Sequence, residues 1–118
     1  LPIKIFILNN EYMGMVRQWQ ELLHDKNYSE SYTAALPDFV KLAEAYGCVG
    51  MRATKPEELD DKIIEMINTD RPVIFDCLVD KQENCFPMIP SGKPHNQMLL
   101  GPKDQKEKKI TGKGKTLV

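Results

Sequence analysis

The apolar positions of the chain fall into short blocks, and three of these blocks have the pattern of buried β-strands. Residues 3–8 are apolar except for Lys4, and such a nearly continuous run is typical of a strand buried on both faces in a parallel sheet. Two similar runs lie at residues 48–53 (CVGMRA) and 71–80 (RPVIFDCLVD). The pattern therefore predicts three strands.

Between these runs, apolar residues recur at the spacing of an amphipathic helix at about residues 14–24, 37–46 and 54–68. In the first segment, the apolar face consists of Met15, Val16, Trp19, Leu22 and Leu23, and the polar face of Arg17, Gln18, Gln20 and Glu21. The buried stripes expected for the other two helices are Phe39, Leu42, Ala43 and Tyr46, and Leu59, Ile63, Met66 and Ile67.

Residues at the ends of these segments predict where the helices begin and end. Pro37 suits the first turn of the second helix, and Gly47 is placed to end it. The stretch Thr54-Lys-Pro-Glu57 has the form of a capping box that opens the third helix. The polar residues 27–36 are expected to form a loop.

The predicted order is strand, helix, helix, strand, helix, strand with short connections, which indicates an α/β fold with a parallel sheet. Three buried strands make a sheet too small to cover both of its faces. We therefore expect a partial doubly wound sheet, about half of a larger domain, over residues 1–100. The chain also opens directly in a strand, which favours the same interpretation. Residues 101–118 are rich in Lys and Gly and are predicted to be a disordered tail.

Composition narrows the class of protein. The chain has 118 residues, of which 42% are hydrophobic and 28% charged, as in one soluble globular domain. A net charge of −1 argues against nucleic-acid binding, and no apolar run approaches the roughly 20 residues of a membrane span. The three cysteines form no Cys-x-x-Cys pair, which favours reduced thiols in the cytoplasm.

Asn9 and Asn10 follow the first predicted strand and precede a predicted helix. In open parallel sheets, ligands bind beyond the carboxyl ends of the strands, and a helix N-terminus favours an anion such as phosphate. An amide oxygen is also a suitable ligand for Mg²⁺. Two interpretations stay open: a magnesium–phosphate site, or a turn that ends the strand, for which asparagine is well suited. The residues by themselves favour the turn.

The string ILNNEYMGMVRQWQ (residues 7–20) resembles the second half of the thiamine-diphosphate motif of the acetohydroxyacid synthases, also called acetolactate synthases. Three further segments resemble the same family in the same order: DFVKLAEAYG (38–47), RPVIFDCLVD (71–80) and PMIPSGKPHNQML (87–99). The resemblance covers residues 1 to about 100 and implies the carboxyl-terminal part of the thiamine-diphosphate-binding domain of the catalytic large subunit.

The resemblance implies a role for nine residues and assigns no catalytic side chain. Asn10 would bind Mg²⁺ through its side chain and Tyr12 through its backbone carbonyl, while Asn9 would shape the turn near the diphosphate. The implied cofactor-binding residues are Asn9, Asn10, Tyr12, Met13, Gly14 and Met15, and the implied substrate or inhibitor pocket consists of Met15, Val16, Trp19 and Ser91.

The activity implied by the resemblance is that of a transferase in branched-chain amino-acid biosynthesis. The intact enzyme would decarboxylate pyruvate on thiamine diphosphate and transfer the hydroxyethyl unit to pyruvate or 2-ketobutyrate. It would be a homo-oligomer with FAD bound outside this chain, and a regulatory small subunit is a further implied partner. The Gly-Asp-Gly half of the cofactor motif is absent from these residues, so the isolated chain is expected to be inactive.

Two alternatives remain. One is another thiamine-diphosphate enzyme, such as a pyruvate oxidase or a glyoxylate carboligase, against which Trp19 and the Gly14-Met15-Val16 triplet argue. The other is a non-catalytic α/β module that binds a partner chain, which the incomplete cofactor motif favours.

Overall fold

The computed structural model describes residues 1–33 and 35–102. The disorder predicted for the tail falls almost wholly on residues 103–118, which lie outside the described residues. The chain divides into two compact units. The first comprises residues 1–12 and 32–82, and the second comprises residues 13–31 and the chain from residue 83 onward.

The first unit is built on a parallel sheet. Its strands are β1 (Lys4–Asn9), β2 (Val49–Ala53) and β3 (Val73–Leu78), in the order β1-β3-β2, with every described pairing parallel. The predicted α/β fold with a partial parallel sheet is therefore confirmed.

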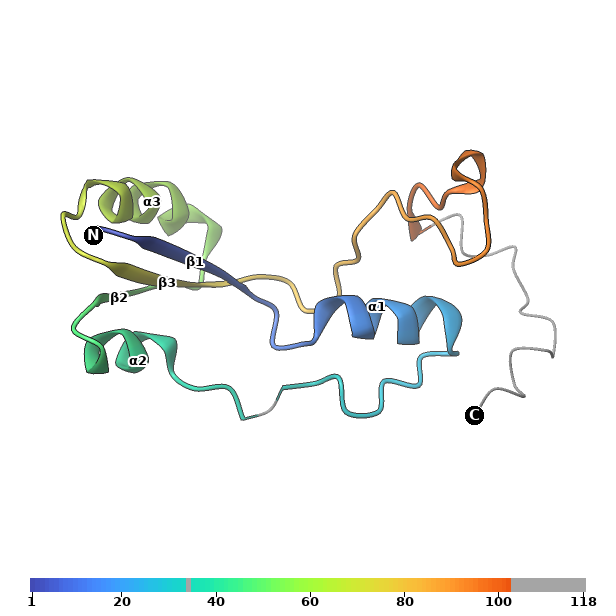
Figure 1. The fold of residues 1–118 in the computed structure, drawn as a ribbon, viewed down its shortest axis with the longest axis horizontal. Coiled ribbons are helices and arrows are strands. Elements are labelled where there is room, and N and C mark those ends of the chain that lie inside the picture. The colour runs from blue at the N-terminus through green and yellow to red at the C-terminus, as the bar shows by residue number, and fades with distance from the viewer. Residues whose placement is uncertain (34, 103–118) are drawn as a thin grey trace. The chain divides into compact units, whose positions relative to one another are not determined.

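Helices α2 (Phe39–Ala45) and α3 (Leu59–Asn68) lie on opposite faces of this sheet (Figure 1). The alternation of side chains along a strand explains how both faces are used. Met51 of β2 packs toward α3, whereas its neighbour Gly50 lies so close to Val40 of α2 that a Cβ atom at position 50 would be 2.6 Å from the Val40 carbonyl oxygen. A glycine at position 50 is what allows α2 to approach the sheet.

The hydrophobic core of the first unit lies between the sheet and α3. Its buried members are Met51, Ala53, Met66, Val73 and Phe75. The central strand β3 contributes the two least exposed of them, because it has neighbours on both sides and a helix against each face.

The prediction that residues 3–8 are buried on both faces is wrong for this chain. Strand β1 lies at the edge of the sheet, where Ile5 is 49% and Leu8 68% exposed. Three residues of the stripes predicted for the second and third helices are exposed as well: Leu42 at 37%, Tyr46 at 78% and Ile67 at 63%. In each case the local pattern marked an apolar face correctly, but the described residues do not cover it.

Two helices begin later than predicted, at Phe39 and at Leu59. Asp38 caps α2, since its carboxylate accepts hydrogen bonds from the Val40 and Lys41 N–H groups, and Pro37 therefore precedes the helix. Before α3, a short 3₁₀ turn at Pro56–Glu58 makes Glu58, and not Glu57, the capping carboxylate. Gly47, at φ +71°, ends α2 as predicted.

The second unit contains helix α1 (Gly14–Leu23) and the segment from residue 83 onward, which includes a 3₁₀ turn at His95–Gln97. Two residues of the predicted polar face of α1 are buried: Arg17 is fully buried and Gln18 is 2% exposed. On the apolar face, Met15 and Trp19 remain 57% and 42% exposed.

Hydrogen bonds to the later segment explain the buried polar face of α1. Arg17 Nη2 donates to the Glu83 carbonyl at 2.8 Å and to Asn84 Oδ1 at 2.7 Å. The Gln18 side chain pairs with the backbone of Cys85 in both directions, donating to its carbonyl at 3.0 Å and accepting from its N–H at 2.7 Å. These bonds offset part of the desolvation cost of burying the two polar side chains.

No helix within residues 1–33 and 35–102 combines the length and the apolar character that crossing a membrane requires.

Candidate functional site

The two asparagines at the end of β1 form a double turn. Asn9 Oδ1 accepts a hydrogen bond from the Glu11 N–H at 3.1 Å, and Asn10 Oδ1 accepts one from the Tyr12 N–H at 3.2 Å. Each side chain thus bonds the backbone two residues further on, which is the asparagine turn that ends strands in many proteins. Glu11, between them, has a φ of +59°, a value that is uncommon for a residue with a side chain.

A second set of bonds holds this turn from the other side. The Glu11 carbonyl accepts hydrogen bonds from the N–H and the hydroxyl of Thr33, at 2.9 and 2.7 Å. The Glu11 carboxylate accepts from Lys81 Nζ at 2.6 Å and from the Tyr32 hydroxyl at 3.0 Å. The bond from Lys81, followed by the bond from Tyr32, holds the pKa of Glu11 below its usual value, and the same carboxylate raises the pKa of Tyr32.

A buried carboxylate lies beside the turn. Asp76, in the central strand β3, is 2% exposed, and each of its oxygens accepts one side-chain hydrogen bond at 2.9 Å. The donors are Asn9 Nδ2 and Arg52 Nε. Arg52 also donates to Asp38 Oδ1 at 2.8 Å, so a line of polar contacts runs from the cap of α2 to the end of β1.

These side chains border a polar cavity of about 450 Å³, whose lining includes Asn9, Arg52, Thr54 and Asp76. It lies at the carboxyl ends of the parallel strands, the edge at which open α/β sheets bind their ligands. Neither Arg52 nor Asp76 was predicted from the sequence as a site residue. The signal for both was present as a single charged residue inside an otherwise apolar strand pattern.

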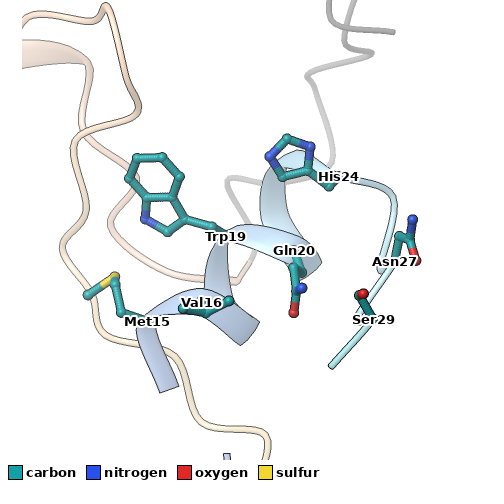
Figure 2. Close-up of a pocket in the computed structure, with 7 residues that line it drawn as sticks. All are labelled: Met15, Val16, Trp19, Gln20, His24, Asn27 and Ser29. Carbon is teal, nitrogen blue, oxygen red and sulfur yellow. The ribbon is translucent and has the colours of Figure 1, made fainter. Parts of the chain in front are cut away.

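The exposed apolar face of α1 borders a second cavity, of about 480 Å³, in the other unit. Figure 2 shows Met15 and Val16 on the first turn of α1 and Trp19 and Gln20 on the next turn. His24 follows just after the end of the helix. Asn27 and Ser29 complete the lining from the segment after the helix. The size is typical of a pocket for a small molecule.

The predicted site residues therefore fall into two groups. Asn9, Asn10 and Tyr12 share one turn, whereas Met15, Val16 and Trp19 share one helix face. The fourth predicted pocket residue, Ser91, is not among the residues that line the cavity. Gln20 and His24 were not predicted as pocket residues, although both follow Val16 along the helix at steps of four residues.

Met13 and Gly14 connect the two groups. The Met13 N–H donates to the Ser31 carbonyl at 2.8 Å, and the Met13 carbonyl accepts from the Arg17 N–H at 2.9 Å. Gly14 is the first residue of α1. Among the residues that the structure describes, no three His, Cys, Asp or Glu side chains gather to form a metal site.

The sequence profile of the thiamine pyrophosphate enzyme C-terminal TPP binding domain matches residues 1–77. The chain therefore belongs to this family of thiamine pyrophosphate (thiamine diphosphate) binding domains. Its curated relatives include acetolactate synthases, as the sequence predicted.

The large subunit of acetolactate synthase from Cyanidium caldarium is 50% identical over 100 residues, which are 84% of this chain and 17% of the relative. The isozyme 3 large subunit from Escherichia coli K12 is 43% identical over 103 residues, 85% of this chain and 18% of the relative. The mitochondrial catalytic subunit of Saccharomyces cerevisiae is 48% identical over 98 residues, 83% of this chain and 14% of the relative. The chain thus spans less than a fifth of the length of these relatives.

Proposed function

We propose that this chain forms the carboxyl-terminal part of the thiamine-diphosphate-binding domain of an acetolactate synthase large subunit. The observation that carries the proposal is the Asn9–Tyr12 turn at the carboxyl end of β1. In this proposal the turn faces the metal of the cofactor, and the exposed face of α1 forms one wall of the substrate pocket.

The residues of the turn fit a Mg²⁺ ion. Mg²⁺ prefers six hard oxygen ligands, often one or two from the protein and the rest from water and phosphate. Asn10 Oδ1 is a neutral oxygen whose direction is set by the Tyr12 N–H, and an amide oxygen has a second lone pair available for a cation. With the backbone carbonyl of Tyr12 as second ligand, this chain would supply two oxygens, and the remaining ligands would come from the diphosphate and from other residues.

Thiamine diphosphate supplies the carbanion chemistry when it is bound, and the protein supplies binding and orientation. Met13, Gly14 and Met15 would lie beside the cofactor. Exposed Met15, Val16 and Trp19 would give the pocket an apolar wall. Such a wall distinguishes 2-ketobutyrate from pyruvate by one methylene, which is worth about 1–3 kcal/mol.

The proposed overall reaction is decarboxylation of pyruvate and transfer of the hydroxyethyl unit to pyruvate or 2-ketobutyrate, in branched-chain amino-acid biosynthesis. FAD, a homo-oligomeric assembly and a regulatory small subunit belong to the same proposal and involve parts beyond this chain. A cytoplasmic location also remains a proposal, since two of the relatives are mitochondrial proteins of yeasts.

A chimera tests the proposal. Residues 1–102 replace the matching segment of the Escherichia coli isozyme 3 large subunit, and acetolactate formation from pyruvate is measured as a function of Mg²⁺. We expect an active chimera and no activity from the isolated chain. Asn10→Ala should raise the half-saturating Mg²⁺ concentration about 10-fold or more, whereas Asn68→Ala, at the exposed end of α3, should leave it unchanged.

A folded chimera without activity would contradict the proposal and would favour the alternative of a partner-binding module. An active chimera in which Asn10→Ala leaves the Mg²⁺ requirement unchanged would exclude Asn10 as a metal ligand.

A further inference from the structure

Asp76 is an unusual residue for its position. It lies in the central strand, where the other buried side chains are those of Val73, Phe75 and Cys77. Burying a carboxylate carries a desolvation cost, and apolar residues of similar size are often as stabilising or more so. Stability of the core therefore does not explain the carboxylate.

The contacts of Asp76 indicate what it does. A carboxylate only accepts hydrogen bonds, so the Asn9 amide must turn its NH₂ group toward Asp76 and its oxygen away from it. That oxygen then meets the Glu11 N–H. With the amide rotated by half a turn, an NH₂ group would face an N–H and an oxygen would face a carboxylate. Asp76 thus selects the orientation of Asn9 that closes the turn.

Arg52 fixes the orientation of the Asp76 carboxylate. Its Nε bonds the oxygen of Asp76 that Asn9 does not use, and its Nη2 bonds Asp38 at the cap of α2. Rotation of the Asp76 carboxylate would break both of its bonds at once. The turn is therefore held by elements that are far from it in the sequence, since Asn9 and Asp76 are 67 positions apart.

We propose that Asp76, oriented by Arg52, is a positioning residue that sets the Asn9–Tyr12 turn and thereby the direction of the oxygens of Asn10 and Tyr12. The inference rests on the proposed function, because it assigns these two oxygens to the metal of the cofactor. Asp76 touches neither the metal nor the substrate and acts through Asn9.

Three variants separate positioning from stability. Asp76→Asn keeps the size of the side chain but leaves one acceptor oxygen for two donors and presents an NH₂ group to one of them. Asn9→Asp combined with Asp76→Asn exchanges the two side chains, so that a carboxylate at position 9 accepts from the Glu11 N–H and from an amide at position 76. Val73→Ala, in the same strand, loosens the core without touching the turn.

The first measurement is hydrogen exchange of the Glu11 and Tyr12 amides in the full 118-residue chain without cofactor. The second is calorimetric binding of thiamine diphosphate to the chimera at a series of Mg²⁺ concentrations. We expect Asp76→Asn to speed both exchange rates and to weaken binding roughly 10- to 100-fold, as for other groups that orient metal ligands. The exchanged pair should return both values to within a few-fold of the parent. Val73→Ala should lower the unfolding temperature and leave both values unchanged.

Folded Asp76→Asn protein with unchanged exchange at Glu11 and Tyr12 would overturn the inference. Faster exchange with unchanged cofactor binding would also overturn the inference, because the conformation of the turn would then have no effect on cofactor binding. Failure of the parent chimera to bind thiamine diphosphate would instead overturn the proposed function, and with it the role toward the metal.

Discussion

Single side chains in this chain replace backbone hydrogen-bond partners, and Glu58 is the clearest case outside the site. Its carboxylate accepts from Lys62 Nζ and from the N–H groups of Thr54 and Lys55, which precede the 3₁₀ turn that leads into α3. The bond from the Thr54 N–H lowers the pKa of Glu58 most, followed by the bonds from Lys62 and Lys55, to about 2.

This lowered pKa predicts a pH dependence. The charged form of Glu58 is favoured in the folded state, so its contribution to stability is complete above the ordinary pKa of 4.5 and is lost as the pH falls toward about 2. Glu58→Gln should therefore lower the midpoint urea concentration of unfolding at pH 7 and reduce the loss of stability between pH 4.5 and pH 2. Urea unfolding at a series of pH values measures both effects. The matched control is Glu57→Gln, on an exposed neighbour, and equal effects of the two substitutions would contradict the assignment.

The candidate site shows which residues can be assigned a structural role from the sequence and which cannot. Asn9 and Asn10 were predictable because the bonds that they make reach only two residues along the chain. Asp76 and Arg52 were not, since their partners come from other strands and from the start of α2. A charged residue in an apolar strand signals that some partner exists, but it does not identify the partner.

At the scale of elements, the sequence predicted every described strand and α-helix, because each rests on local periodicity. The burial of Arg17 and Gln18 on the polar face of α1 was not predicted, since it depends on hydrogen-bond partners that residues 83–85 supply. The hydrophobic pattern indicates which face of a helix is more apolar. It does not show whether residues later in the chain supply hydrogen-bond partners for the polar face.

The packing of α2 on the sheet gives a prediction at this scale. Since a Cβ atom at Gly50 would lie within 3 Å of the Val40 backbone, Gly50→Ala should force α2 away from β2. We expect the free energy of unfolding to fall by about 1–3 kcal/mol, the usual cost of overpacking.

Urea unfolding of Gly50→Ala measures this cost. Gly101→Ala is the matched control, because a Cβ atom there would meet no atom within 4 Å. Unchanged stability in Gly50→Ala would show that α2 shifts at no cost.

At the scale of the whole molecule, much apolar surface is exposed. Strand β1 forms one edge of the sheet, and Ile5 and Leu8 on it are about half to two-thirds exposed. Exposed strand edges and large apolar patches promote association.

The isolated chain should therefore self-associate. In sedimentation, its average mass is expected to rise with protein concentration, and Leu8→Lys, which places a charge on the exposed edge, should lower that rise. A constant monomer mass over a wide concentration range would contradict the prediction.

The pairing of Gln18 with Cys85 has a consequence for how freely this part of the chain can vary. At residue 85, Gln18 bonds the main-chain N–H and carbonyl and not the side chain, and nineteen of the twenty amino acids share these atoms. The Gln18 amide also donates to Met88 Sδ at 3.0 Å. The two positions therefore carry unequal constraint: position 85 should accept nearly any residue except proline, which lacks the N–H, whereas position 18 needs a side chain that both donates and accepts at the reach of glutamine. In a library of sequences selected for folding, we expect glutamine to be retained at position 18 while the residue at position 85 varies.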